Sequence, residues 1–188
     1  MRTKLEDIVN LHKPLTPDSV VIDCGGYKGD YSQEVINRWN PHITIFEPVP
    51  EFYEFCKERF KSNSKVQILP LALGTEIEER TLYVNKDSSS FYKDWARLDN
   101  HIEVFAVQLN NEIDEDETIA ILKINCEGAE FEILQDLHEN NLLQNIEEVL
   151  IQFHRISNFN EKYPLAVATL EKTHNKVYDN KWQLWRKK

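Results

Sequence analysis

The sequence lacks the features that define several large classes of protein. No apolar run approaches the roughly 20 residues needed to span a bilayer, and residues 1–8 are charged, without the apolar core of a signal peptide. We therefore expect no membrane span and a cytoplasmic location. The only cysteines, Cys24, Cys56 and Cys126, are odd in number and widely spaced, which predicts neither a disulfide framework nor a zinc site.

Positive charge is also scarce. The chain has 22 lysines and arginines against 32 aspartates and glutamates, and its formal net charge is −10. Proteins that bind a phosphate backbone are usually basic, so the charge argues against a nucleic acid partner. A length of 188 residues suits a single domain over residues 1–188, and no feature of the sequence indicates an oligomeric state.

The sequence does contain an alternation of short β-rich runs and amphipathic stretches. Such alternation is typical of an α/β protein with a mainly parallel central sheet flanked by helices. The expected strands are 20–24, 43–46, 66–69 continued by 71–73, 119–124 and 149–153, and the expected helices are 30–39, 50–60, 129–138 and 164–173. A hairpin of 176–178 and 182–185 is expected to close the sheet. In between, 80–84 and 104–109 alternate like strands and 87–95 is expected to be a loop.

Glycine is rare but clustered. Of five glycines, Gly25, Gly26 and Gly29 lie together between the first expected strand and the first expected helix. Glycine there permits positive φ angles and lets a ligand approach the backbone, so the segment predicts a nucleotide cradle; a merely tight turn is the alternative. Only Gly26-x-x-Gly29 fits the dinucleotide fingerprint, because Cys24 occupies its first glycine position.

Glu47 ends the second expected strand, about 20 residues after the glycines, where an acidic side chain can accept hydrogen bonds from both ribose hydroxyls. Enzymes that use NAD and enzymes that use S-adenosylmethionine share this device. Glu47 therefore indicates a nucleoside without choosing between the two.

A series of motifs follows in order over about residues 19–155. They are Val21 to Ser32, Phe46-Glu47-Pro48-Val49-Pro50, Leu71 to Gly74, Leu122 to Glu130 and Ile151 to His154. The series resembles the FkbM-type methyltransferases, a family of S-adenosylmethionine-dependent O-methyltransferases. The resemblance implies a Rossmann-like class I fold with about seven strands, the last one antiparallel, with S-adenosylmethionine as cofactor and S-adenosylhomocysteine as product. The cofactor-binding residues it implies are Asp23, Gly25, Gly26, Tyr27, Glu47, Pro48, Ala72 and Asn125.

The chain departs from the family pattern in two places. Gly26 and Tyr27 replace the Ala and Asn of Asp-Val-Gly-Ala-Asn-x-Gly, which keeps the loop small. Asn125 replaces the Asp of Leu-Lys-Ile-Asp, which removes a carboxylate from the reaction end of the sheet. A divalent metal could bind there but is not predicted, because Mg²⁺ prefers carboxylates.

The expected catalytic residues follow the fourth and fifth core strands, since ligands of open α/β sheets bind beyond the carboxyl ends of the strands. We expect His154 to be the general base, because its reference pKa of about 6.5 suits proton removal. Glu127 would orient the imidazole or serve as the base itself, and a purely structural role is the alternative for His154. Glu130 is equally well interpreted as a partner of a helix dipole.

Acceptor contacts are expected in the 88–95 loop. Ser89, Tyr92 and Trp95 combine hydroxyls with aromatic rings, which suits a sugar; a loop held to the core by its own aromatic residues is the alternative.

The function predicted is O-methyl transfer to a hydroxyl of a sugar, glycan or other polyhydroxylated small molecule. Two alternatives stay open: a non-catalytic subunit that binds the nucleoside or S-adenosylmethionine, and an NAD-dependent oxidoreductase, which would need the missing first glycine. Asn125-Cys126-Glu127-Gly128 differs from the Asp/Asn-Pro-Pro-aromatic motif of nucleobase amino-methyltransferases, and the Pro-Cys dipeptide of C5-cytosine enzymes does not occur.

Overall fold

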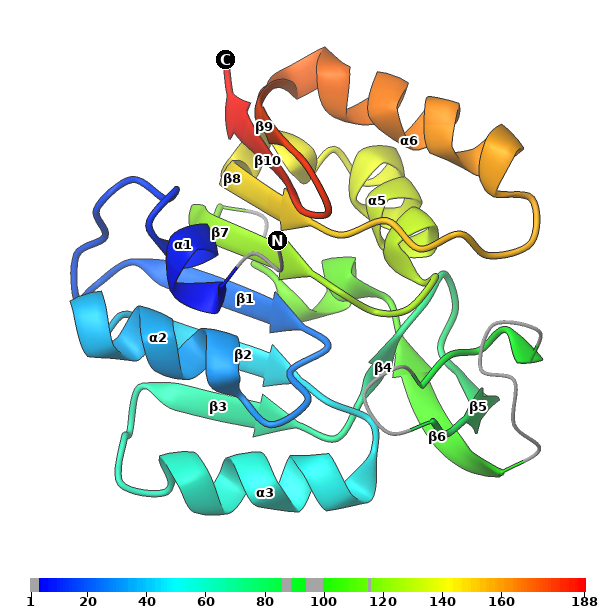
Figure 1. Ribbon diagram of the computed structural model, residues 1–188, viewed down its shortest axis with the longest axis horizontal. Coiled ribbons are helices and arrows are strands. Elements are labelled where there is room, and N and C mark those ends of the chain that lie inside the picture. The colour runs from blue at the N-terminus through cyan, green and yellow to red at the C-terminus, as the bar shows by residue number, and fades with distance from the viewer. Residues whose placement is uncertain (1–3, 86–88, 94–99, 115) are drawn as a thin grey trace.

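The computed structural model describes residues 4–85, 89–93, 100–114 and 116–188, and within them the strands form two sheets (Figure 1). The larger sheet has seven strands in the order β3-β2-β1-β7-β8-β10-β9. They are β1 (Val20–Cys24), β2 (His42–Phe46), β3 (Val66–Leu69), β7 (Ile119–Ile124), β8 (Ile146–Ile151), β9 (His174–Asp179) and β10 (Gln183–Lys187). The first five of these are parallel, whereas β10 runs antiparallel to both of its neighbours. This confirms the α/β fold with a mainly parallel sheet whose last strand is antiparallel.

Helices cover both faces of the larger sheet. Val21 of β1 packs in one core cluster with residues of α1 (Leu5–Val9), α2 (Asp30–Trp39) and α3 (Pro50–Phe60). Ile22 and Cys24 belong to the other cluster, with α5 (Glu130–Glu139) and α6 (Phe159–Thr173). The strands read as nearly continuous apolar runs because both of their faces are buried.

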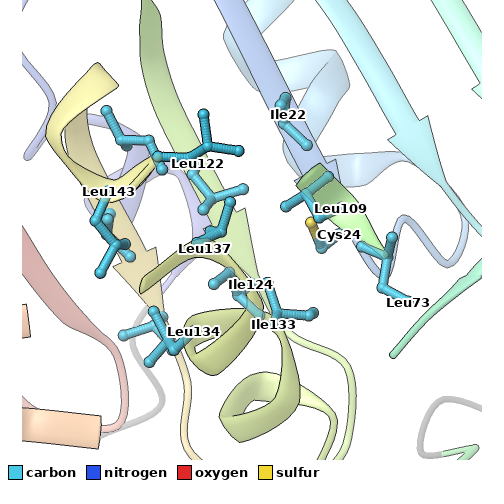
Figure 2. Packing of buried hydrophobic residues seen from close by; sticks show 14 of the residues in the cluster. Ile22, Cys24, Leu73, Leu109, Leu122, Ile124, Ile133, Leu134, Leu137 and Leu143 are labelled. Carbon is cyan, nitrogen blue, oxygen red and sulfur yellow. The ribbon is translucent and has the colours of Figure 1, made fainter. Parts of the chain in front are cut away.

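The helices form where the apolar spacing and the turn residues favour them. Proline begins α3, where its missing N–H costs nothing. On α5, Ile133, Leu134 and Leu137 share one face and meet Leu122 and Ile124 of β7 (Figure 2). Burying each such side chain contributes about 1.5–3 kcal/mol, which holds α5 against the carboxyl end of β7.

The second sheet stands beyond the carboxyl ends of β1, β2 and β7, at the right of Figure 1. It consists of β4 (Ala72–Leu73), β6 (His101–Val107) and β5 (Glu78–Tyr83), in that order. Leu82, Val104 and Ala106 form a third apolar cluster with Val49 and Phe52. The small sheet is thereby fixed next to the start of α3.

The expected strand over 66–69 and 71–73 is in fact two strands in two different sheets. Pro70 separates them; it has no N–H to donate and restricts the residue before it, so the larger sheet ends there. The expected strand 104–109 stops at Val107, and Leu109–Glu112 forms a 3₁₀ helix. Sequence patterning predicted the strands of this region but not that they form a separate sheet.

Two further elements differ from expectation. Helix α6 begins at Phe159, so Pro164 lies inside it and not at its first position. The preference of proline for helix starts misled the prediction because the flanking residues extend the helix by more than a turn. The short helix α1 was not expected. In the described part of the chain, no helix is long and apolar enough to cross a membrane.

Candidate active site

A cavity opens at the carboxyl ends of the parallel strands, between the two sheets. Its wall comes from the segments that follow β1, β2 and β7, from residues 71–73, and from Leu82, Ser89 and Phe91. The neighbours of β1 in the sheet are β2 on one side and β7 on the other. Ligands of open α/β sheets bind at such a switch point.

Close backbone contacts shape the turn after β1. The N–H groups of Gly25 and Gly26 both donate to the carbonyl oxygen of Phe46, at 3.0 and 3.1 Å. Gly25 has a φ of 81°, and a Cβ there would lie 2.2 Å from the backbone oxygen of Asn125. Glycine therefore lets the turns after β1 and β7 approach each other and leaves backbone exposed to a ligand.

A buried ion pair supports this turn. The ammonium group of Lys123 donates to Asp23 Oδ1 and to the carbonyl oxygen of Gly25, both at 2.7 Å, and Ser32 Oγ donates to Asp23 Oδ2 at 2.7 Å. Asp23 is fully buried and balanced by Lys123, so it acts on the turn from behind the cavity wall. Sequence reasoning gave Lys123 no role, although it is the one charged residue in the otherwise apolar strand β7.

Glu47 lies in the wall with both carboxylate oxygens fixed. The N–H of Tyr27 donates to Oε2 at 2.6 Å, and the N–H of Val49 donates to Oε1 at 2.9 Å. Burial raises the pKa of Glu47 to about 7, although these two hydrogen bonds lower it. Each oxygen has a further lone pair, so the carboxylate can still accept hydrogen bonds from a ligand's hydroxyls.

Asn125 also lines the cavity. Its Oδ1 is buried and has no hydrogen-bond partner among the described residues. An unsatisfied buried acceptor costs roughly 1–3 kcal/mol, so this oxygen favours a ligand that brings an N–H or O–H donor into the cavity.

Glu127 and His154, the two expected catalytic residues, lie side by side. Glu127 lines the cavity, and its Oε1 lies 3.3 Å from Nε2 of His154. His154 is 5% exposed and lies behind Glu127, where its Nδ1–H donates to Glu130 Oε1 at 2.8 Å. Burial lowers the pKa of His154, but the hydrogen bond to Glu130 and the charges of Glu130 and Glu127 outweigh it, so the net pKa is raised.

The segment 89–93 contributes two residues to the wall, Ser89 and Phe91. The guanidinium of Arg80 lies 3.8 Å from the centre of the Phe91 ring, a cation–π contact that fixes the ring. The cavity thus has a hydroxyl beside an aromatic surface at this end.

Tyr92 lies in this segment but outside the wall. Its hydroxyl donates to Glu132 Oε1 at 3.3 Å and accepts from the ammonium of Lys162 at 3.1 Å. Trp95 lies outside the described residues.

The structure gathers most of the expected site residues around one cavity. Those in its wall are Gly25, Tyr27, Glu47, Pro48, Ala72, Asn125, Glu127 and Ser89. Asp23, Gly26, His154 and Tyr92 lie outside it. Sequence reasoning missed most of the apolar part of the wall, chiefly Phe46, Phe52 and Leu82, because these residues resemble ordinary core residues until the second sheet is placed.

The described residues around the cavity do not form a metal-binding site. In the part of the chain that the structure describes, no group of three or more His, Cys, Asp or Glu side chains is arranged to hold an ion.

The fold is of the Rossmann-like, class I type, with its cavity at the carboxyl ends of the parallel strands. Residues 23–179 match the family model described as the methyltransferase FkbM domain. The chain therefore belongs to the FkbM methyltransferase family, and its cofactor is S-adenosylmethionine. Family membership decides against the NAD-dependent alternative.

Solved structures agree on the fold. Precorrin-6y C5,15-methyltransferase from Geobacter metallireducens has a TM-score of 0.54 and 13% identity, over 97% of this chain and 87% of that one. An rRNA methylase from Streptococcus thermophilus has a TM-score of 0.57 and 9% identity, over 100% and 98% of the two chains. M. capricolum TrmK, in complex with S-adenosyl-homocysteine, has a TM-score of 0.51 and 13% identity, over 97% and 67%. No curated protein matches the sequence.

Proposed function

We propose that this methyltransferase acts on a hydroxyl group of a sugar, a glycan or another polyhydroxylated small molecule. One observation carries the proposal: the Glu127 carboxylate faces the cavity with the His154 imidazole 3.3 Å behind it. A hydroxyl must lose its proton as it attacks, which calls for a base within reach, whereas a neutral amine can lose its proton afterwards.

The residues around the cavity suit S-adenosylmethionine. The Glu47 carboxylate would accept hydrogen bonds from its ribose hydroxyls. The unpaired Oδ1 of Asn125 would accept from its ammonium group, and the side-chain-free backbone of Gly25 leaves room for close approach. When bound, the cofactor supplies a methyl group on a sulfonium that leaves readily.

Glu127 is the group proposed to touch the acceptor. Glu127 would take the proton of the acceptor hydroxyl as the acceptor oxygen attacks the methyl group, and S-adenosylhomocysteine would be the leaving group. When each ring nitrogen of His154 carries a proton, Nδ1–H donates to Glu130 and Nε2–H faces Glu127 Oε1 and the amide of Gln152. The raised pKa of His154 favours that imidazolium form. His154 would then orient Glu127 and keep it ionised.

The acceptor class follows from the other end of the cavity. Ser89 offers a hydroxyl and Phe91 an aromatic ring in the same wall. Sugars present CH faces for aromatic rings and hydroxyls for polar partners. The carboxylates of Glu47 and Glu127 also line the cavity and can accept hydrogen bonds from hydroxyls.

The test is methyl transfer from labelled S-adenosylmethionine to panels of sugars, glycosides, phenols and amines. We expect turnover with polyhydroxylated acceptors, and in Glu127→Gln a loss of roughly 10²–10⁴-fold with S-adenosylhomocysteine affinity kept. Transfer only to amines or nucleic acid would contradict the proposal. Binding without transfer to any acceptor would favour the non-catalytic alternative.

The pH dependence separates the two candidate bases. If Glu127 is the base and His154 the cation behind it, activity declines at alkaline pH, as the imidazolium loses its proton. If His154 is the base, activity declines at acid pH, as the imidazole becomes protonated, and His154→Ala loses more turnover than Glu127→Gln.

A further inference from the structure

Glu130 contacts the imidazole of His154 and the backbone on either side of Glu127. The residue is fully buried at the first position of α5. Its Oε1 accepts from His154 Nδ1–H at 2.8 Å and from the N–H of Cys126 at 3.0 Å, and its Oε2 accepts from the N–H of Gly128 at 2.9 Å. One buried carboxylate thus satisfies three donors from two separate segments.

These hydrogen bonds fix the turn 126–128. Glu127 has a φ of 49°, in the left-handed region that residues other than glycine adopt only when their surroundings impose it. Glu130 binds the N–H groups on either side of Glu127, and Ser90 Oγ donates to the carbonyl oxygen of Glu127 at 2.5 Å. With its backbone held at three points, the Glu127 side chain projects into the cavity wall.

Glu130 also controls the imidazole. Its negative charge and hydrogen bond favour the doubly protonated ring, whose Nε2–H then faces Glu127 Oε1 at 3.3 Å and the side-chain amide of Gln152 at 2.7 Å. The other charged groups acting on His154 are Glu127, in the same direction, and Lys181, whose charge opposes protonation.

We infer that Glu130 is a positioning residue for methyl transfer: it holds His154 and the 126–128 turn so that the Glu127 carboxylate faces the acceptor. The inference rests on the proposed function. It goes beyond a helix-dipole role, which would need a carboxylate near the start of α5 but no contact with His154.

Glu130→Gln keeps the size of the side chain but puts an NH₂ group where a donor now points. We expect turnover to fall about 10²-fold, as for a misplacement of about 1 Å at a reacting group, while the affinity for S-adenosylhomocysteine is kept. Because the pKa of His154 falls without the Glu130 charge, the alkaline decline of activity moves to lower pH.

Asp136→Asn is the matched control. Asp136 is a buried carboxylate on the same helix and accepts from the N–H of Asn110 at 3.0 Å. We expect this variant to lose stability but to keep the parent's pH profile. A Glu130→Gln variant with the parent's rate and pH profile, or one that changes only as the control does, would overturn the inference.

A second measurement does not depend on catalysis. In ¹⁵N-histidine NMR titrations, the pKa of His154 should be lower in Glu130→Gln than in the parent, and unchanged in Asp136→Asn. An unchanged His154 pKa in Glu130→Gln refutes the inference even if methyl transfer is observed. If the pKa falls but the parent methylates no hydroxyl, the proposed function fails while the contact of Glu130 with His154 stands.

Discussion

At the scale of single residues, the surroundings and not the residue type set the charge of the buried groups. Burial raises the pKa of Glu47 to about 7. For Glu148 burial acts in the same direction, but hydrogen bonds from His12 and Arg186 outweigh it and the pKa is lowered. Glutamates of one chain thus differ in charge near neutral pH.

Glu47 leads to a prediction about ligand binding. Ribose hydroxyls donate better to a carboxylate than to a carboxylic acid, so the parent's affinity for S-adenosylhomocysteine should rise between pH 6 and pH 8. Glu47→Gln should weaken binding at pH 8 by about 1.5–3 kcal/mol per charge-assisted hydrogen bond lost and should show a flatter pH dependence. Calorimetric titrations at both pH values measure this, and identical pH dependence in the two proteins would refute the ribose contact.

In the ligand-free protein, the same raised pKa predicts that folding stability changes with pH in the opposite direction to ligand affinity. The pKa of Glu47 in the folded state, about 7, exceeds its ordinary value of 4.5. The folded state therefore holds this proton more tightly, and its stability falls as the pH rises from 4.5 through 7. Glu47→Gln should accordingly gain stability relative to the parent on going from pH 5 to pH 8.

At the scale of elements, the turns between strands and helices carry most of the site. The turn after β1 leads into α2 through Gly29, whose φ is 73°. A Cβ at this position would lie 2.5 Å from the ring of Phe60 on α3. The same glycine thus sets the start of α2 and its distance from α3.

Gly29→Ala should therefore destabilise the protein by roughly 1–3 kcal/mol, through backbone strain and overpacking. Gly74→Ala is the control, because a Cβ there meets the flexible tip of Arg80, at 2.8 Å, and no positive φ is involved. We expect it to cost less than about 1 kcal/mol. Urea denaturation of both variants measures the difference, and equal losses would contradict this account of the turn.

At the scale of the whole molecule, a buried polar cluster connects the segment around His12 to strands β8 and β10. Glu148 of β8 accepts from His12 Nδ1–H and from Arg186 Nε–H of β10, both at 2.7 Å. Tyr31 of α2 joins the cluster through its hydroxyl, 3.0 Å from His12 Nε2. Glu148 thereby joins β8, β10 and the segment around His12, and His12 links them to α2.

Glu148→Gln should lower the free energy of unfolding at pH 7 by roughly 1–3 kcal/mol, because it weakens buried charge-assisted hydrogen bonds. Since the pKa of Glu148 is lowered in the folded state, its contribution is present above the ordinary value of 4.5 and is lost as the pH falls through the lowered value. The difference between variant and parent should therefore shrink in acid. Chemical denaturation at several pH values measures it.

Glu147→Gln is the neighbouring control. Glu147 pairs with Lys187 at 3.0 Å on the surface, where such pairs contribute about 0–1 kcal/mol. If both variants lose the same small amount at every pH, the buried cluster does not stabilise the fold.

The sequence by itself determined the succession of core strands and helices along the chain, the glycine turn after β1 and the acidic residue after β2. These features depend on local rules: the period of apolar residues, the special φ angles of glycine and the place of a carboxylate at a strand end. The same motifs carried the resemblance to the FkbM family. They placed Glu47, Asn125 and Glu127 in one region because parallel strands end at the same edge of a sheet.

Only the tertiary structure decided what joins these parts. After Pro70 the chain enters a second sheet, whose Leu82 lines the cavity together with Phe91 of the segment 89–93. The bond of Lys123 to Asp23 spans 100 residues and that of His154 to Glu130 spans 24. Such pairs, and the pKa values they set, depend on burial and on the distance between remote segments, which no local pattern of residues specifies.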